Sequence, residues 1–152
     1  MLVADDDQTA AAAAAQLSEA GIAVRGALEG GFAAWRAAGL PEGQVGEVAV
    51  EELPSLSDDS TVVDVREPME WATGHVPGAL LIPLGKLRES VSTIPRRGRV
   101  IAICEAGVRS CTAASILEAA GFADVAHVPA GSSGYRRSGL PLAFPQEKVV
   151  GA

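Results

Sequence analysis

Cysteine, histidine and positive charge are all scarce in this chain of 152 residues. It contains two cysteines, two histidines and 12 basic residues against 19 acidic ones, which gives a formal net charge of −7. This acidity argues against a nucleic acid or an anionic membrane surface as the partner. Cys104 and Cys111 stand on an expected loop and the helix after it, a placement that does not indicate a structural disulfide and that fits a reducing compartment.

Long apolar runs and a basic leader are also missing. The longest apolar stretches are too short to span a bilayer. Residues 5–7 are three aspartates, and no basic residue precedes them as in a signal peptide. We therefore predict no signal peptide and a cytoplasmic protein. His75 and His127 show no metal-ligand spacing with each other or with the cysteines, and we expect no metal and no cofactor.

Cys104 stands between an apolar run, residues 100–103, and an alanine-rich run, residues 111–120. This pattern predicts that a strand ends and a helix begins here. Loop N–H groups then converge on the sulfur with the helix dipole behind them, and they favour the thiolate, the nucleophilic form of cysteine. The alternative is a half-buried structural cysteine in a βα turn, against which Gly107 and Arg109 argue.

Three motifs stand in register around this cysteine. The loop 104–110 has the pattern Cys-x-x-Gly-x-Arg-Ser, and upstream lie Val-Val-Asp-Val-Arg-Glu at 62–67 and Gly-His-Val-Pro-Gly-Ala at 74–79. In this order and spacing they resemble a rhodanese domain, over about residues 47–142. The resemblance implies a rhodanese-like α/β fold with a parallel five-stranded sheet, and a sulfane sulfur carried as a persulfide on Cys104.

The order of predicted elements leads to the same architecture. Strands are expected at 48–50, 61–65, 80–82, 99–103 and 125–128, and helices or helical turns at 51–56, 67–71, 85–91, 110–120 and 131–138. Alternating strands and helices imply a parallel sheet with helices on both faces, and ligands of such sheets bind beyond the carboxyl ends of the strands. Cys104 and the turn at Asp64 and Arg66 both fall on that edge.

The loop supplies the predicted substrate-binding residues. The backbone amides that would hold the sulfur's negative charge belong to Glu105, Ala106, Gly107, Val108, Arg109 and Ser110. The Arg109 side chain is a candidate cation for an anionic substrate or persulfide; alternatively it forms an ion pair with a carboxylate such as Asp64.

Three other residues near the loop are assigned supporting or packing roles. By resemblance to the family's Asp-x-Arg motif, Asp64 and Arg66 are interpreted as supports of the edge of the site. Cys111 could resolve an oxidised Cys104, but a small buried helix residue is the favoured interpretation.

The length of the loop and the charge of Glu105 limit which reaction and which sulfur donor we expect. Six residues from Cys104 to Arg109 match the sulfur-carrying rhodaneses, whereas the related cell-cycle phosphatases use a loop one residue longer. Glu105 departs from the basic residue often found there in thiosulfate-using members, and a carboxylate repels a dianion. Thiosulfate is therefore in doubt as the donor, and a persulfide of a small thiol or a partner protein is the alternative.

We therefore predict a sulfurtransferase or persulfide carrier that passes sulfur from a small donor, persulfide or thiosulfate, to a thiol or other nucleophilic acceptor. The alternative from another class is a non-catalytic regulatory or binding module of a larger multidomain protein.

The chain also repeats itself at an offset of 100 residues. Eleven of the first 41 positions are identical to their counterparts. Although a shared Ala and Gly bias supplies an alternative, the match predicts a duplication. Residues 1–41 would be the C-terminal half of a degenerate rhodanese repeat, 42–46 a linker, 47–142 the complete domain and 143–152 a tail.

The first copy lacks the residues that would carry and bind sulfur in the second. Ala4, Asp7 and Thr9 stand where the second copy has Cys104, Gly107 and Arg109, so this copy cannot carry sulfur. Its front half is missing, which suggests a fragment of a longer tandem protein. Because so small a piece cannot bury enough surface alone, it must be disordered, pack onto the complete domain or pair with a second chain. We expect a homodimer through residues 1–41.

Overall fold

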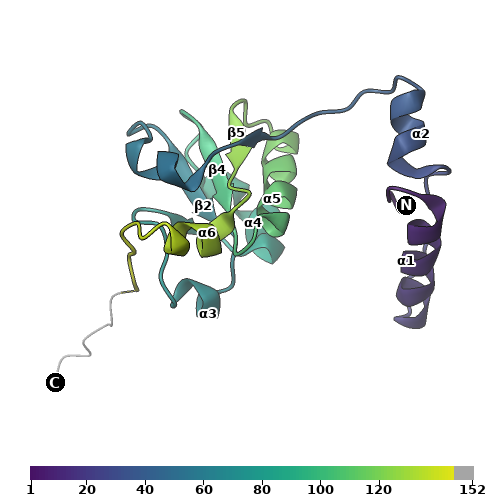
Figure 1. The fold of residues 1–152 in the computed structure, drawn as a ribbon, viewed down its shortest axis with the longest axis horizontal. Helices are drawn as coiled ribbons and strands as arrows, with labels where there is room; N and C mark the ends of the chain where they lie inside the picture. Colours follow the sequence, from purple (N-terminus) through teal and green to yellow (C-terminus); the bar gives the residue numbers. More distant parts are fainter. Residues whose placement is uncertain (146–152) are drawn as a thin grey trace. The chain divides into compact units, whose positions relative to one another are not determined.

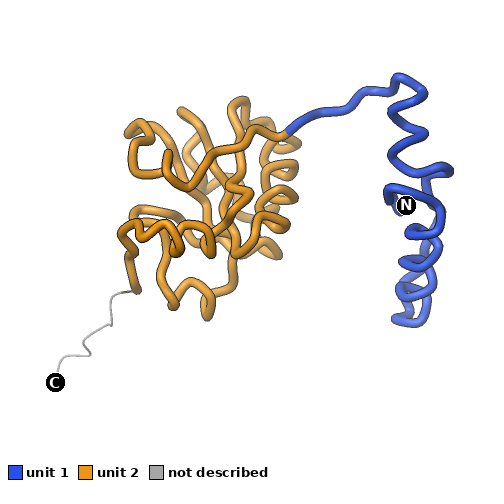
Figure 2. Tube along the Cα trace, in the orientation of Figure 1, with its two compact units in different colours: residues 1–44 blue, residues 45–152 orange. Residues whose placement is uncertain are grey.

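The computed structural model describes residues 1–145, so most of the predicted tail lies outside the described residues. The chain divides into two compact units, Met1–Gln44 and Val45–Ala152 (Figure 2). The division falls inside the predicted linker, and each unit is described by itself. Among the described residues, no helix is long and apolar enough to cross a membrane.

The second unit is built on a five-stranded sheet. Its strands are β1 (Gly46–Glu47), β2 (Thr61–Asp64), β3 (Leu80–Leu81), β4 (Val100–Ile103) and β5 (Val125–His127). They lie in the order β1-β5-β4-β2-β3, and every neighbouring pair is parallel. The predicted α/β class with a parallel five-stranded sheet is confirmed.

Helices cover both faces of this sheet. The helices of this unit are η1 (Val50–Ser55), α3 (Pro68–Trp71), α4 (Leu84–Ser90), η2 (Val91–Thr93), α5 (Val108–Ala119) and α6 (Gly131–Arg137), of which α3 contributes no buried residue (Figure 1). One buried cluster joins the sheet to Leu87 of α4 and Leu117 of α5. A second cluster on the opposite face joins it to Leu53 of η1 and Tyr135 of α6.

Strand β4 sits in the middle of the sheet and is buried on both faces. Val100 and Ala102 belong to the cluster under α4 and α5, whereas Ile101 and Ile103 belong to the opposite one. This is the period of two that a strand imposes. Cys104 continues the alternation and belongs to the cluster under α5.

The first strand was predicted at residues 48–50, and this is wrong by two residues. The pairing with β5 is at Gly46 and Glu47. Val48 and Val50 are both buried. The Val48 N–H still donates to the His127 carbonyl at 3.0 Å, whereas Val50 already belongs to η1 and fills the core from a helical turn.

The first unit contains two helices, α1 (Asp7–Glu19) and α2 (Gly31–Ala37). Asp6 begins α1, because its carboxylate accepts a hydrogen bond from the N–H of Thr9 at 2.7 Å. One parallel bridge, Leu2 with Ala27, is the only β-pairing in this unit.

Backbone geometry repeats at the same offset as the sequence. Helix α2 spans 31–37 and α6 spans 131–137. The Phe32 N–H donates to the Ala4 carbonyl at 2.8 Å, and the Ser132 N–H donates to the Cys104 carbonyl at 2.7 Å.

The end of each helix is closed in the same way. The Trp35 indole N–H donates to the Pro41 carbonyl at 2.9 Å, and the Tyr135 hydroxyl donates to the Pro141 carbonyl at 2.9 Å. The correspondence therefore extends from the helices to a side-chain hydrogen bond.

Candidate active site

Cys104 directly follows β4 and is 1% exposed. The loop after it reaches Gly107, whose φ of 88° is left-handed, and α5 begins at Val108. A Cβ at Gly107 would collide with the Pro129 carbonyl oxygen, so both the backbone angle and the space require glycine. The predicted junction of strand, loop and helix is present.

In the cysteine loop, the first two carbonyls have hydrogen-bond partners, whereas the first three N–H groups after Cys104 have none in the described part of the chain. The N–H groups of Ser132 and Ser133, at the start of α6, donate to the carbonyls of Cys104 and Glu105 at 2.7 and 3.1 Å. Within residues 1–145, the N–H groups of residues 105–107 donate to no backbone or side-chain acceptor. Those amides are available to an anion at the start of α5.

Asp64 and Arg66 form a buried ion pair beside the loop. Both side chains are fully buried, and Arg66 Nη2 lies 2.7 Å from Asp64 Oδ2. The guanidinium also donates to the carbonyls of Glu70 and Gly74 at 3.2 and 3.0 Å. Arg66 thus connects the end of β2 to the α3 segment.

Arg109 forms an ion pair with a neighbouring carboxylate, as in the alternative expectation, but its partner is Glu70 of α3 and not Asp64. Its two terminal nitrogens donate to the Glu70 oxygens at 2.8 and 2.6 Å. This bidentate bond lowers the pKa of Glu70 to about 2. It also raises the pKa of Arg109, to which the charge of Cys104 contributes less. Arg109 lies near the sulfur but is already held by a carboxylate.

Glu105 is not an unpaired charge beside the loop. Its carboxylate forms an ion pair with Arg136 of α6 and lies 3.5 Å from Arg66 Nη1. Two guanidiniums therefore offset the repulsion that the sequence predicts for a dianion. Glu70 and Arg136 are two of the six charged residues in the ion pairs around the loop, and the sequence did not single out either of them.

Behind Cys104 lie two buried polar side chains. Cys104 Sγ is 3.6 Å from the hydroxyl of Ser110, which in turn lies 3.3 Å from Nδ1 of His127. Ser110 was expected to contribute its amide, whereas His127 was assigned no role. The register would have located it, because His127 pairs with Ala102, two residues before the cysteine.

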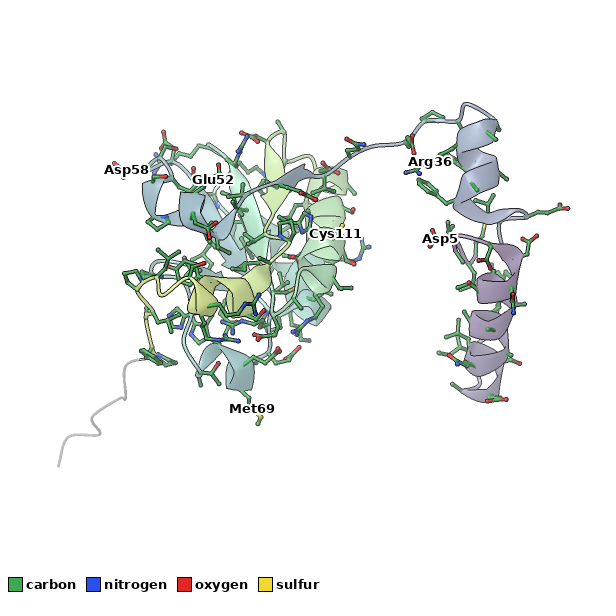
Figure 3. The ribbon with its side chains drawn as sticks, in the orientation of Figure 1. Asp5, Arg36, Glu52, Asp58, Met69 and Cys111 are labelled. Carbon is green, nitrogen blue, oxygen red and sulfur yellow. The ribbon has the colours of Figure 1, made fainter. Side chains whose placement is uncertain are left out.

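Cys111 is exposed, so its interpretation as a buried helix residue is wrong. Figure 3 shows it on the outer side of α5. The buried residues of that helix are Ser110, Ala113, Ala114, Ile116 and Leu117, and Cys111 lies at the margin of the face that they form. His75, by contrast, is buried in its turn and stacks on Trp71 with ring centroids 3.4 Å apart.

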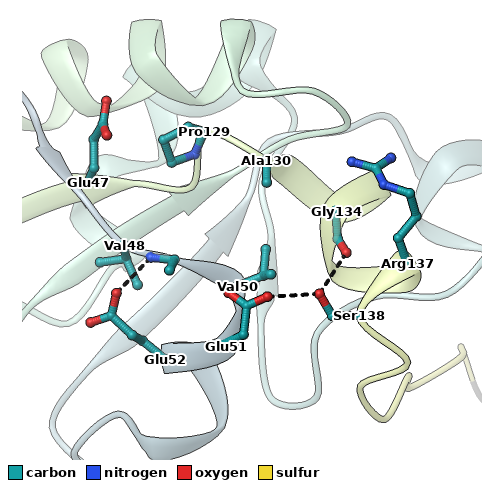
Figure 4. A pocket seen from close by; sticks show the side chains of 11 residues that line it. Glu47, Val48, Val50, Glu51, Glu52, Pro129, Ala130, Gly134, Arg137 and Ser138 are labelled. Atoms are coloured by element: carbon teal, nitrogen blue, oxygen red, sulfur yellow. Dashed lines mark hydrogen bonds between the residues drawn. The ribbon is translucent and has the colours of Figure 1, made fainter.

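A cleft opens at the carboxyl ends of β1 and β5, with a volume of about 580 Å³ (Figure 4). Its lining includes Glu47, Pro129, Gly134 and Arg137. Pro129 also packs against Gly107, so the cleft borders the back of the cysteine loop. Among residues 1–145, no group of three or more His, Cys, Asp and Glu side chains is arranged to hold a metal ion.

In comparison with known proteins, the matched part of the chain includes Cys104 and the residues around it. Residues 49–138 match the model of the rhodanese-like domain. A sulfurtransferase of Allochromatium vinosum is 33% identical over 105 residues, which cover 67% of this chain and 98% of that protein. A probable adenylyltransferase/sulfurtransferase of Mycobacterium tuberculosis, MoeZ, is 36% identical over 72 residues, but these cover only 18% of its length.

Solved structures have the same architecture. A rhodanese-related protein of Thermoplasma volcanium superposes with a TM-score of 0.61 at 28% identity and covers 66% of this chain and 99% of its own. A rhodanese-like domain protein of Staphylococcus aureus superposes with a TM-score of 0.60 at 28% identity, over 67% of this chain and the whole of its own.

Proposed function

This chain belongs to the rhodanese-like domain family, with sulfurtransferases among its relatives, and we propose that it carries sulfane sulfur as a persulfide on Cys104. The observation that carries this proposal is the position of the cysteine. Its sulfur lies at the start of α5, beside a loop whose first three N–H groups have no partner among the described residues.

The proposed chemistry has two transfers. The Cys104 thiolate attacks the outer sulfur of a donor persulfide, a bond to that sulfur forms, and the donor leaves as a thiolate. An acceptor thiolate then attacks the same sulfur, and Cys104 leaves as a thiolate. No net oxidation or reduction occurs, and the order is ping-pong.

The loop amides would stabilise the negative sulfur in both steps. They are fixed before reaction, because α6 holds the carbonyls of Cys104 and Glu105 and Gly107 is locked against Pro129. Donors fixed in advance need no reorganisation as charge develops. The N–H groups of Val108, Arg109 and Ser110 lie in the first turn of α5 and complete the proposed set.

We propose a persulfide of a small thiol or of a partner protein as the donor. Arg109 and Arg136 are both engaged with carboxylates, Glu70 and Glu105, so neither cation is free to receive a dianion. Because Glu105 is paired with Arg136, its carboxylate repels thiosulfate less strongly than an unpaired carboxylate would. A thiol is the proposed acceptor.

Cyanolysis tests the proposed function. The protein is incubated with a small-molecule persulfide, separated from excess donor, and treated with cyanide. We expect thiocyanate in proportion to protein, from the wild type and from Cys111→Ser. A non-catalytic binding module would release none.

Residues 1–41 are proposed to be half of a second, degenerate rhodanese repeat, followed by a linker at 42–46 and the complete domain at 47–142. In support, α2 and α6 occupy corresponding positions, and the bond from Phe32 to Ala4 matches that from Ser132 to Cys104. The first unit has no strands that correspond to β2 and β3.

We further propose that this half repeat pairs with its copy in a homodimer and that the protein works in the cytoplasm. Ala10 and Gly31 are the only buried residues of its helices, whereas Val3 and Ile22 are more than half exposed. Removal of residues 1–44 should therefore convert a dimer to a monomer in light scattering and leave cyanolysis unchanged. A truncated protein that stays dimeric would contradict the dimer.

A further inference from the structure

A chain of buried polar groups runs from the Cys104 sulfur to the far edge of the sheet. It joins the end of β4, the first turn of α5 and the end of β5 through Cys104, Ser110 and His127, which are 1%, 0% and 7% exposed. The sulfur lies 3.6 Å from Ser110 Oγ, and Ser110 Oγ lies 3.3 Å from His127 Nδ1. Groups from three separate elements thus meet behind the cysteine.

The Ser110 hydroxyl has three polar neighbours but only one proton to donate. It has one proton to donate and two lone pairs that can accept. Besides Cys104 and His127, it contacts the Gly107 carbonyl oxygen at 2.9 Å, which can only accept. The hydroxyl can therefore accept from the thiol and donate to either Gly107 or His127, and it can turn to donate to a thiolate.

The other ring nitrogen of His127 faces a carboxylate. His127 Nε2 lies 3.9 Å from Oε1 of Glu47, its partner in the register of β1 and β5. This carboxylate favours a proton on Nε2, which leaves the lone pair of Nδ1 for the Ser110 hydroxyl. Glu47 lines the cleft of Figure 4, so the chain ends at solvent.

The first unit lacks all three buried members together. At the offset of 100 residues, Ala4, Ala10 and Ala27 replace Cys104, Ser110 and His127. The framework is retained, because the Leu28 N–H donates to the Leu2 carbonyl at 3.0 Å as the Val128 N–H does to the Ala102 carbonyl. The three positions thus changed together, as expected if Ser110 and His127 serve the thiol.

We propose that His127 accepts the proton of Cys104 through the Ser110 hydroxyl, and that Glu47 holds the resulting imidazolium. The S–H bond breaks and its electron pair stays on sulfur; the proton passes to Ser110, whose own proton passes to Nδ1. This assignment rests on the proposed function, since it gives the persulfide chemistry its thiolate. Besides Glu47, a charged group that interacts with Cys104 is Arg109 of α5, which is itself paired with Glu70.

His127→Asn tests the relay, because an amide can keep the hydrogen bond to Ser110 but takes up no proton. In a Cys111→Ser background, thiolate formation is followed against pH by ultraviolet absorbance and by the rate of iodoacetamide labelling. We expect the midpoint to move up by about one pH unit and labelling at pH 7 to fall about tenfold. His75→Asn, the matched control, should keep the wild-type profile.

An unchanged profile in His127→Asn would overturn the proposal. Ser110→Ala should reproduce the shift; a shift in Ser110→Ala alone would show that the hydroxyl acts without the histidine, which also overturns it. If circular dichroism shows that His127→Asn is unfolded, Glu47→Gln at the exposed end decides: a smaller shift in the same direction supports the relay, and none contradicts it. The titration needs no sulfur donor, so failure of the relay and failure of sulfur transfer are separate results.

Discussion

The two units repeat one framework and differ in what it carries. Helices α2 and α6 begin and end at corresponding residues, and each is closed by a hydrogen bond to a proline carbonyl, from Trp35 in one unit and Tyr135 in the other. Only the second unit has a cysteine at the end of its strand. Gly31 and Gly39 in one unit and Gly131 and Gly139 in the other all have a left-handed φ. Local hydrogen bonds and these glycines therefore specify both helices, which persist where the cysteine is absent.

The units differ just as much in burial. In the second unit, β4 lies between β2 and β5 and is fully buried, whereas the corresponding segment of the first unit has a single bridge, Leu2 with Ala27. A cysteine at position 4 would thus lack both the sheet and the loop that surround Cys104. The scaffold and the nucleophile can therefore be altered separately by mutation.

The largest effect is expected at the nucleophile. Cys104→Ser should abolish release of thiocyanate, because a hydroxyl forms no stable persulfide, and it should leave the circular dichroism spectrum intact because the volume is nearly the same. Adding Ala4→Cys to that variant should restore nothing, since Asp7 and Thr9 replace the glycine and arginine of the loop. Recovery of sulfur carriage would show that the first unit is not degenerate.

The buried ion pair has no counterpart in the first unit and should dominate stability. Asp64→Ala leaves the fully buried Arg66 guanidinium without its carboxylate, and we expect the free energy of unfolding to fall by about 3–5 kcal/mol. The matched control is Asp124→Ala, which breaks the half-exposed pair with Arg99 and should cost at most about 1 kcal/mol. Urea denaturation that shows equal losses would refute the supporting role of Asp64.

A smaller effect is expected at Glu105, which helps to set the charge beside the loop. Glu105→Gln frees Arg136, so turnover with thiosulfate should rise about two- to fivefold, more than with an uncharged persulfide donor. The gain should shrink as salt is added. Glu118→Gln, an exposed change on α5, is the control; equal gains for both donors at all salt concentrations would show that Glu105 does not select by charge.

The smallest effect concerns Glu70, whose pKa is lowered from 4.5 to about 2, chiefly by the bond from Arg109. Because the folded-state pKa is depressed, the pair stabilises the fold above about pH 4.5, and this contribution is lost as the pH falls through about 2. Glu70→Gln should cost about 0.5–1 kcal/mol at pH 7, as for partly exposed pairs, and the difference should disappear below about pH 2. A difference in unfolding free energy that does not change with pH would contradict this.

The sequence predicted the fold because its signals are local and periodic. Buried strands alternate with helices, and Gly107 and Gly121 mark positions where α5 begins and ends. Periodicity alone does not decide the exposure of Cys111, because this residue lies at the margin of the face formed by the buried residues of α5, which are Ser110, Ala113, Ala114, Ile116 and Leu117.

The missed residues depend on contacts between distant elements. Glu70 reaches Arg109 across 39 positions, and Arg136 reaches Glu105 across 31. No spacing in the sequence encodes these pairs, because they are set by how α3 and α6 pack against the loop. The position of His127 near Cys104 could be recognised only from the register of β4 and β5, and this register is known only once the sheet is assembled.

Mass spectrometry of intact protein and of its peptides tests the central claim most directly. After incubation with a small-molecule persulfide, we predict the added mass of one sulfur atom on the peptide that contains Cys104, and its removal by cyanide or by excess thiol. Cys111→Ser should gain the same mass and Cys104→Ser none. Added sulfur on Cys111 alone, or none on the wild type, would contradict a persulfide carried by Cys104.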